Sequence, residues 1–414
     1  MRSVARAFMP ASYRSGPAGV KLSLFAPTLF TRPWRPTGIR AKLPFVRVLG
    51  FMTGTSLDAV DMAVLQTDGE TIASFGPAGE RKLDAATRAI IEEATAAARS
   101  WARDTTRPLV FGRAARAIAD QHLLAANEFL AAAGLSAKSL DFVGVHGQTV
   151  LHEAPTAQRP IGRTVQLIDA HRIAEALDLP VAFDFRGVDV AAGGHGAPLA
   201  PIYHQALTQW SGLKPPVAVL NLGGVGNITL IGADGLLEAF DTGPANGMID
   251  LLVQARTSAR CDENGALARA GTVNEAVLGA YLSHRHFSAR GPKSLDRFDF
   301  SLDPVGALSL EDAAATLTVF AAEAVALGLR DCSQPPRRVI VCGGGRHNPT
   351  LMQAIRKRFD GPVSAAESLG WRGDSIEAEA IAYLAARTFT GLPISFPATT
   401  GVPRPMSGGR IARP

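Results

Sequence analysis

The fold is decided by the stretch Val46–Leu65, which reads VRVLGFMTGTSLDAVDMAVL. Apolar residues alternate on both sides of the segment 50–58, GFMTGTSLD, so the pattern predicts a strand, a tight turn and a second strand. Gly50 and Gly54 let the backbone bend and approach a ligand, and successive N–H groups in such a turn can bind an anion. A polar hairpin turn rich in Thr and Ser is the alternative, and the pattern alone leaves both open.

Two carboxylates accompany this turn, Asp58 and Asp61. Carboxylate oxygens can hold a hydrated divalent cation beside a bound anion. The turn is not a Walker loop, because it contains no GKS or GKT and no helical pattern follows it directly.

Length and composition indicate a globular protein. The 414 residues predict two domains or one large α/β unit, and 47% hydrophobic with 19% charged residues is typical of soluble proteins. We expect no apolar run long enough to cross a bilayer. Three widely spaced cysteines, Cys261, Cys332 and Cys342, form no metal-ligand pattern and fit a reducing cytoplasm.

The net charge of +5 is weak support for a nucleic-acid partner. No Asp or Glu precedes Asp58, while Arg and Lys recur throughout that part, so the remainder of the chain is near neutral. We therefore expect neither nucleic acid nor membrane as a partner. Residues 1–43 are rich in Pro and Arg and are interpreted as a disordered basic extension, with an organelle transit peptide as the alternative.

The chain after the first hairpin alternates helices with short strands, which predicts an α/β fold with parallel βαβ units. A second strand–glycine turn–strand pattern occurs at 216–231, around Gly223 and Gly224. This repetition suggests two related domains. The predicted division is an extension at 1–43, a first domain at 44–190, a second at 191–395 and a loose tail at 396–414.

Four glycine-rich turns follow predicted strand ends: 50–58, Gly147, Gly223-Gly224 and 343–345. In open parallel sheets ligands bind at the carboxyl ends of strands, so four such turns suggest a long ligand that carries several phosphates. No GxGxxG fingerprint opens a strand–helix unit, so the pattern argues against a dinucleotide-binding fold.

Asp241 lies in the segment 239–246, AFDTGPAN, just after an apolar stretch. A carboxylate held there can act as a general base toward a hydroxyl or water. The alternative is that Asp241 or Asn246 caps the helix that begins there.

Two further segments carry candidate ligands. Asp184, Arg186 and Asp189 in DFRGVD could grip a polyhydroxylated ligand, or form an interdomain salt bridge. Lys293 could reach a phosphate or carboxylate, or be a solvated loop lysine. His146 is expected to be a hydrogen-bond partner, since no metal-ligand pair of histidines occurs.

Taken together, seven motifs closely resemble the anhydro-N-acetylmuramic acid kinase family of the actin-like sugar kinase and chaperone ATPase superfamily. The resemblance runs from about Val46 to about Arg387. It is carried by GFMTGTSLDAVD, HGQTVLHEAP, DFRGVDVAAGGHGAPL, LNLGGVGNIT, FDTGPANGMID, ARGPKS and VCGGGRHN.

The resemblance implies two ribonuclease H-like (actin-like ATPase) domains of the α/β class, with the active site in the cleft between them and with ATP and Mg²⁺ as cofactors. It implies Asp241 as the catalytic base and Asp58 as the metal ligand. The implied nucleotide-binding residues are Gly54, Thr55, Ser56, Leu57, Asp58, Asp61, Gly223, Gly224, Gly343, Gly344 and Gly345. The implied substrate-binding residues are Asp184, Arg186, Asn246 and Glu377.

The implied reaction opens the 1,6-anhydro ring of 1,6-anhydro-N-acetylmuramic acid with water and phosphorylates O6 from ATP, in cytoplasmic recycling of the cell wall. The partners are thus a small-molecule sugar and ATP, and a homodimer is expected from the family alone. Some segments differ from the family pattern: His195 replaces Gln, and the segments at Asp169 and at Leu295-Asp296 also depart. Two alternatives therefore stay open, a kinase of another sugar and a non-catalytic ATP-binding module.

Overall fold

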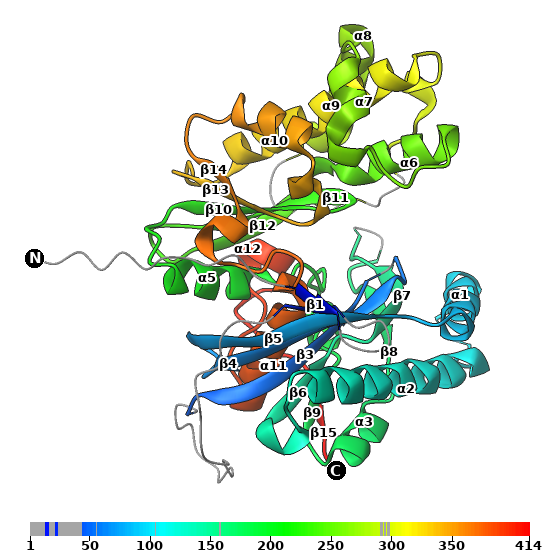
Figure 1. Ribbon diagram of the computed structural model, residues 1–414, viewed down its shortest axis with the longest axis vertical. Helices are drawn as coiled ribbons and strands as arrows, with labels where there is room; N and C mark the ends of the chain where they lie inside the picture. The colour runs from blue at the N-terminus through cyan, green and yellow to red at the C-terminus, as the bar shows by residue number, and fades with distance from the viewer. Residues whose placement is uncertain are drawn as a thin grey trace, which may run out of the picture. The chain divides into compact units, whose positions relative to one another are not determined.

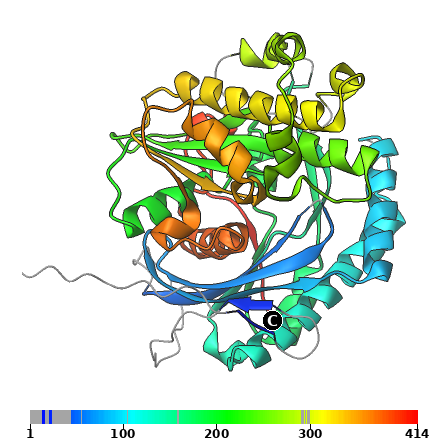
Figure 2. The ribbon, with the colours of Figure 1, turned by 45° about the horizontal axis from the view of Figure 1, so that its top comes forward.

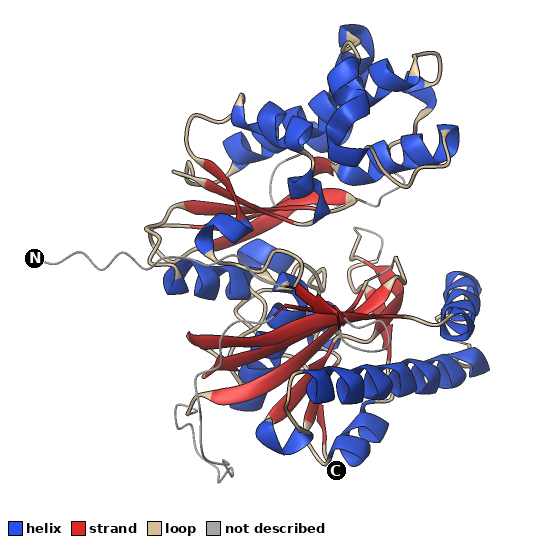
Figure 3. Cartoon of the chain, in the orientation of Figure 1, coloured by secondary structure: helices blue, strands red, loops and turns tan. Residues whose placement is uncertain are grey.

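The computed structural model describes residues 13–15, 21–23, 44–54, 56–103, 105–156, 159–289, 293, 295 and 299–414. The chain forms two compact units, each with a sheet and helices of its own (Figures 1 and 3). Unit 1 comprises Met1–Gly194, Glu377–Ile394 and Met406–Pro414, and unit 2 comprises His195–Ile376 and Ser395–Pro405. The first boundary lies close to the predicted one at 190/191, but unit 1 also includes two later segments that the prediction assigned elsewhere.

Unit 1 is built on the hairpin predicted at 46–65. The two strands of this hairpin, β3 and β4, pair antiparallel, with Val46 opposite Thr67 and Thr53 opposite Val60. In sheet order the strands are β1 (Tyr13–Ser15), β2 (Lys21–Ser23), β5 (Ile72–Lys82), β4 (Ala59–Thr67), β3 (Val46–Thr53), β6 (Phe142–Val145), β9 (Val181–Phe183) and β15 (Arg410–Ala412). β3 and β6 are parallel, as are β6 and β9, so the sheet is mixed rather than wholly parallel.

Helices cover both faces of this sheet. Leu49, Phe51, Val143 and Val145 point to one face, where they pack in one hydrophobic core with α1 (Ala85–Ser100), α2 (Leu109–Ala132) and α3 (Ala170–Leu177). The opposite face receives α11 (Ile376–Thr390) (Figure 2). A Cβ added at Gly144 would lie 2.7 Å from the Ile381 carbonyl oxygen, and one at Gly50 would meet the Ala378 carbonyl. The two glycines therefore let α11 approach the sheet closely.

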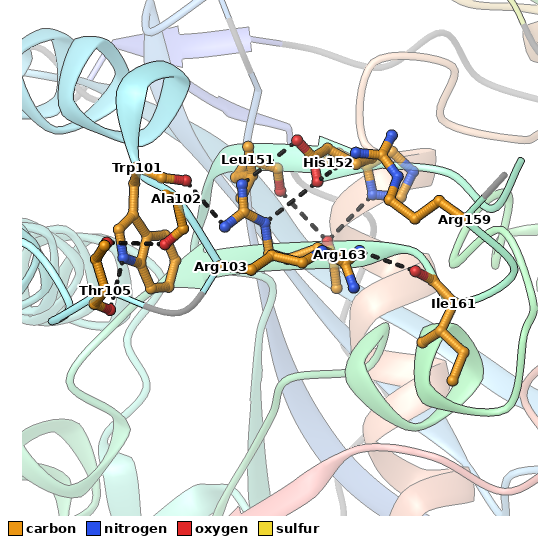
Figure 4. A network of polar contacts seen from close by, with 11 residues as sticks. Trp101, Ala102, Arg103, Thr105, Leu151, His152, Arg159, Ile161 and Arg163 are labelled. Carbon is orange, nitrogen blue, oxygen red and sulfur yellow. Dashed lines mark hydrogen bonds and ion pairs between the residues drawn. The ribbon is translucent and has the colours of Figure 1, made fainter.

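A two-stranded ribbon, β7 (Gln148–Glu153) and β8 (Arg163–Leu167), leaves the main sheet after Gly147, whose φ is +72°. Figure 4 shows the polar contacts that fix this ribbon to the end of α1. The Arg163 guanidinium lies 4.9 Å from the Trp101 ring centroid and donates to the Trp101 carbonyl at 3.0 Å and to Glu153 at 3.2 Å. These contacts fix the position of the ribbon. The last helix of this part of unit 1 is α4 (Gly187–Ala191), which follows β9.

Unit 2 repeats the strand order of the centre of unit 1. Its sheet runs β12 (Leu237–Pro244), β11 (Val225–Ile231), β10 (Val217–Leu222), β13 (Val339–Cys342) and β14 (Val363–Ala365). In both units an antiparallel three-stranded meander is followed by two parallel strands on the side of its first strand. The two related domains predicted from the repeated hairpin are confirmed at the level of topology.

The helices of unit 2 are α5 (Pro201–Trp210), α6 (Asn246–Arg256), α7 (Ala266–Ala270), α8 (Glu275–Leu282), α9 (Leu310–Asp331), α10 (Pro349–Arg356) and α12 (Pro397–Thr400). α9 begins after Ser309, whose side chain caps the helix by accepting the Asp312 N–H at 3.1 Å. Contrary to our expectation, α9 is long and apolar enough to cross a membrane. Its most apolar window is 78% buried within the protein, which identifies α9 as a core helix.

Two predictions about the chain ends need correction. The tail predicted at 396–414 is wrong, because α12 forms there and β15 pairs antiparallel with β9, with Ala412 fully buried. Short apolar stretches such as Ile411-Ala412 show no periodicity, so only their tertiary partner reveals them. Within the predicted disordered extension, β1 pairs with β2 and β2 pairs with β5, and the rest of 1–43 lies outside the described residues.

Candidate active site

Asp241 lies in β12, at the edge of the sheet of unit 2. Its register partner on β11 is Asn227. On the side without a strand, the Asp241 N–H donates to the Lys293 carbonyl at 2.9 Å, and the Asp241 carbonyl accepts from His286 Nε2 at 3.1 Å. Both backbone polar groups of Asp241 therefore have a partner on the open side of the edge strand.

The Asp241 carboxylate lines a cavity of about 170 Å³ in unit 2. The other lining residues are His195, Ala197, Pro198, Asn227, Ala239, Phe240, Lys293 and Thr399. Asp241 Oδ2 accepts the Leu295 N–H at 2.8 Å. Burial raises the pKa of Asp241 to about 6, and the Leu295 hydrogen bond opposes this rise. A carboxylate of this kind is ionised at neutral pH and basic enough to accept a proton.

The capping alternative for Asp241 and Asn246 does not hold. The residue that precedes α6 is Ala245, and the helix has no side-chain cap. The Asn246 amide nitrogen donates instead to both carboxylate oxygens of Asp250, at 3.2 and 3.1 Å. Burial raises the pKa of Asp250 to about 6, and the Asn246 hydrogen bond counteracts it.

The structure brings the two predicted glycine turns of unit 2 together. β10 and β13 are parallel neighbours, with Asn221 opposite Cys342, so Gly223 and Gly343 follow adjacent strand ends. Gly343 has a φ of +77°, and a Cβ there would lie 2.7 Å from the Leu222 carbonyl oxygen. A Cβ on Gly344, in contrast, would meet nothing within 4 Å. Gly224 accepts the Ala245 N–H at 3.1 Å, which places the start of α6 beside the same turn.

The first predicted turn, in unit 1, is a true turn after β3. The Leu57 N–H donates to the Gly54 carbonyl at 3.3 Å, and Leu57 adopts a left-handed φ of 57°. Ser56 and Asp58 are exposed, and Thr55 lies outside the described residues. The described residues hold no cluster of three His, Cys, Asp or Glu that could bind a metal. Mg²⁺ usually takes only one or two carboxylates plus water and phosphate, so an exposed Asp58 near Asp61 suits it.

Arg186 and Glu377 both belong to unit 1, where they interact. The Arg186 guanidinium contacts His146 Nε2 at 3.0 Å through Nη2. Burial raises the pKa of Glu377 and the Arg186 charge opposes the rise, although the Glu377 side chain keeps accessible surface. Burial and the Arg186 charge together lower the pKa of His146 to about 3, so His146 is neutral and its Nε2 accepts the guanidinium. His146 is thus a hydrogen-bond partner, as predicted.

Asp184 and Lys293 have partners within the protein. Asp184 has a φ of 53° and its carboxylate accepts the Gly187 N–H at 3.2 Å, at the start of α4. Lys293 is not the solvated lysine of the alternative interpretation, because its side chain is 9% exposed and lies 3.0 Å from Asp331 Oδ2. His286 and Thr399 were missed from the sequence, since no motif links them to Asp241, and His195 was noted only as a departure from the family pattern.

Comparison with known proteins gives concordant results. The family model described as anhydro-N-acetylmuramic acid kinase matches residues 46–414. The protein of that name from Caulobacter vibrioides is 64% identical over 88% of this chain and 98% of its own length. The one from Phenylobacterium zucineum is 61% identical over 89% of this chain and all of its own length.

A solved structure, component A of the (R)-2-hydroxyglutaryl-CoA dehydratase of Acidaminococcus fermentans, has a TM-score of 0.42 and 13% identity, over 83% of this chain and 98% of that chain. A likeness of this size carries no functional argument.

Proposed function

Because this chain belongs to the anhydro-N-acetylmuramic acid kinase family and is an ATP-dependent sugar kinase, we propose that Asp241 is the base with which it opens and phosphorylates 1,6-anhydro-N-acetylmuramic acid. The observation that carries the assignment is the buried Asp241 carboxylate, with a pKa of about 6, in a cavity of unit 2. Substrates of this enzyme are a small-molecule sugar and ATP.

In the proposed reaction Asp241 takes a proton from water as the water oxygen bonds to the anomeric carbon. The bond from that carbon to O6 breaks, and the freed O6 bonds to the γ-phosphorus of ATP while ADP leaves. The products are N-acetylmuramic acid 6-phosphate and ADP. A base whose pKa lies just below the working pH combines an ionised resting state with useful proton affinity.

The nucleotide is assigned to the glycine turns. Gly223 and Gly224 are proposed to bind phosphate through backbone N–H groups, and Gly343, Gly344 and Gly345 to border the adenosine. Open space at Gly344 supports this, because a ligand can approach the backbone there. The turn 54–58 of unit 1, with Thr55 outside the described residues, is proposed to contact phosphate as well.

Mg²⁺ is proposed to be held by Asp58 through water, with Asp61 nearby. When bound, it would neutralise negative charge on the phosphates. Arg186, Glu377, Asp184 and Asn246 are proposed to bind the sugar. The Arg186 contact with His146 supports an oriented guanidinium, whereas the Asn246 amide nitrogen is engaged by Asp250. A cytoplasmic location and a homodimer belong to the same proposal.

The test is a coupled ADP-release assay with ATP and Mg²⁺, with and without 1,6-anhydro-N-acetylmuramic acid. We expect sugar-dependent release by the wild type and a loss of about 100-fold or more in Asp241→Asn, the range typical of a missing general base. In the wild type kcat/KM should fall below about pH 6, where Asp241 becomes protonated.

Asp234→Asn is the matched control, because the Asp234 carboxylate also accepts a backbone N–H, that of Leu236 at 3.1 Å, but does not line this cavity. Equal activity of Asp241→Asn and wild type would exclude Asp241 as the base. Turnover only with a different sugar would support the alternative of a kinase of another sugar. ATP binding without turnover would support the alternative of a non-catalytic ATP-binding module.

A further inference from the structure

Asp241 makes three hydrogen bonds with three described residues of one short stretch of chain, 286–295: it donates one and accepts two. They come from the Lys293 carbonyl, which accepts the Asp241 N–H, and from the Leu295 N–H and His286 Nε2–H, which donate to Asp241. β12 is an edge strand, and edge strands present unpaired backbone groups. The stretch therefore supplies partners that the sheet does not, and it sets the position of both the backbone and the carboxylate of Asp241.

Lys293 anchors this stretch. Its Nζ donates to the carbonyls of His286 at 3.4 Å and Ala289 at 3.2 Å, and to Asp331 Oδ2 at 3.0 Å. An ammonium group has three N–H donors, so all three are engaged within the protein. The first two contacts join Lys293 to the described residues 286–289, and the third joins it to the last residue of α9.

Lys293 also lines two cavities. One is the cavity at Asp241, and the other measures about 320 Å³ and is lined by Glu238, Phe240, Lys293, Arg330, Asp331, Cys332 and Ser333. Phe240 and Lys293 are common to both, and the ammonium lies 5.6 Å from the centroid of the Phe240 ring. We expect the loss of the Lys293 side chain to open the Asp241 cavity toward the second one.

We propose that Lys293, held by Asp331, is a positioning residue for the base: it fixes the stretch 286–295 on the edge of β12 and so orients Asp241. The inference rests on the proposed role of Asp241. It differs from the interpretation of Lys293 as a ligand for a phosphate or carboxylate, because the ammonium is engaged by three protein oxygens.

The experiment compares four single variants and the double variant Lys293→Met/Asp331→Asn. Lys293→Met and Asp331→Asn each remove the ion pair, from opposite ends, and Lys293→Arg can restore it. Arg358→Met is the matched control, since Arg358 contacts Glu323 on the same helix α9 at 2.7 Å and does not line the Asp241 cavity. The readouts are kcat, the KM for ATP and sugar, and the pH dependence of kcat/KM.

We expect Lys293→Met and Asp331→Asn to lower kcat by about 10- to 100-fold, as small displacements of a catalytic group do, with each KM changed less than about twofold. Loss of the Leu295 hydrogen bond should raise the pKa of Asp241, and so move the acid limb of the kcat/KM pH profile up by about half to one pH unit. A shift of this size corresponds to the free energy of one hydrogen bond. Asp331→Asn leaves in place the other titratable residues that line the cavity, His195 and Lys293, and the adjoining His286. The double variant should resemble the single ones, Lys293→Arg should recover most of the activity, and Arg358→Met should match the wild type.

Hydrogen exchange of the peptide that covers 286–295 gives a readout without catalysis. We expect faster exchange in Lys293→Met and Asp331→Asn than in Arg358→Met. The proposal is overturned if exchange and the acid limb match the wild type, or if Lys293→Met raises a KM while Asp331→Asn does not. Activity retained by Asp241→Asn would instead refute the proposed function, whatever Lys293 does.

Discussion

At the residue scale, the proposed proton transfer depends on Asp241, whose carboxylate must be ionised although burial disfavours its charge. The folded-state pKa of Asp241, about 6, lies above the ordinary unfolded value near 3.9. The folded protein thus binds this proton more tightly than the unfolded chain does. The corresponding contribution to stability is present below about pH 4 and is lost as the pH rises through about 6.

This linkage predicts that Asp241→Asn is more stable than the wild type at neutral pH. The Asn amide carries no charge, and its oxygen can still accept the Leu295 N–H. We expect a melting temperature about 2 to 4 °C higher at pH 7.5 and about half of that difference at pH 5, which lies between the folded and unfolded pKa values. Thermal unfolding followed by circular dichroism at both pH values measures this, and a lower melting temperature at pH 7.5 would contradict it.

At the element scale, the approach of α11 to the sheet of unit 1 depends on two glycines. The Cβ of an alanine at position 144 would lie 2.7 Å from the Ile381 carbonyl oxygen and 2.8 Å from the Ala385 Cβ. Neither neighbour can move without displacing the helix, because one is backbone and the other is a buried methyl group. The size of the residue at position 144 therefore determines how closely α11 can approach β6.

We predict that Gly144→Ala lowers the free energy of unfolding by about 1 to 3 kcal/mol, as overpacking does. Gly112→Ala is the matched control, because Gly112 lies within α2 with nothing within 4 Å of an added Cβ. That change should stabilise by about 0.5 to 1 kcal/mol through helix propensity. Urea unfolding of both variants decides the matter, and equal stabilities would refute the packing argument.

At the scale of the whole molecule, the chain leaves unit 1 and returns to it twice, after residue 376 and after residue 405. The second return delivers β15, which pairs with β9. On the way, Thr388 donates to the Gly408 carbonyl at 2.9 Å and the Ile394 N–H donates to the Met406 carbonyl at 2.8 Å. The C-terminal residues thus complete unit 1 rather than form a separate tail.

Deletion of residues 406–414 should therefore destabilise unit 1. We expect a melting temperature lower by about 5 °C or more and faster hydrogen exchange in α11 and β9, because an edge strand and its buried Ala412 are lost. Deletion of the exposed residues 413–414 alone is the control and should leave both unchanged. Unaltered exchange in β9 after the longer deletion would show that β15 contributes nothing to the unit.

Local sequence patterns alone determined the two hairpins and the glycine turns, since each depends on neighbours along the chain. The motifs likewise predicted the family and singled out Asp241. Tertiary structure decided what distant segments do: β15 joins β9, α11 returns to unit 1, and Lys293 and His286 hold Asp241. These contacts join residues tens to hundreds of positions apart, and neither periodicity nor turn chemistry encodes which distant groups will satisfy an edge strand or a buried charge.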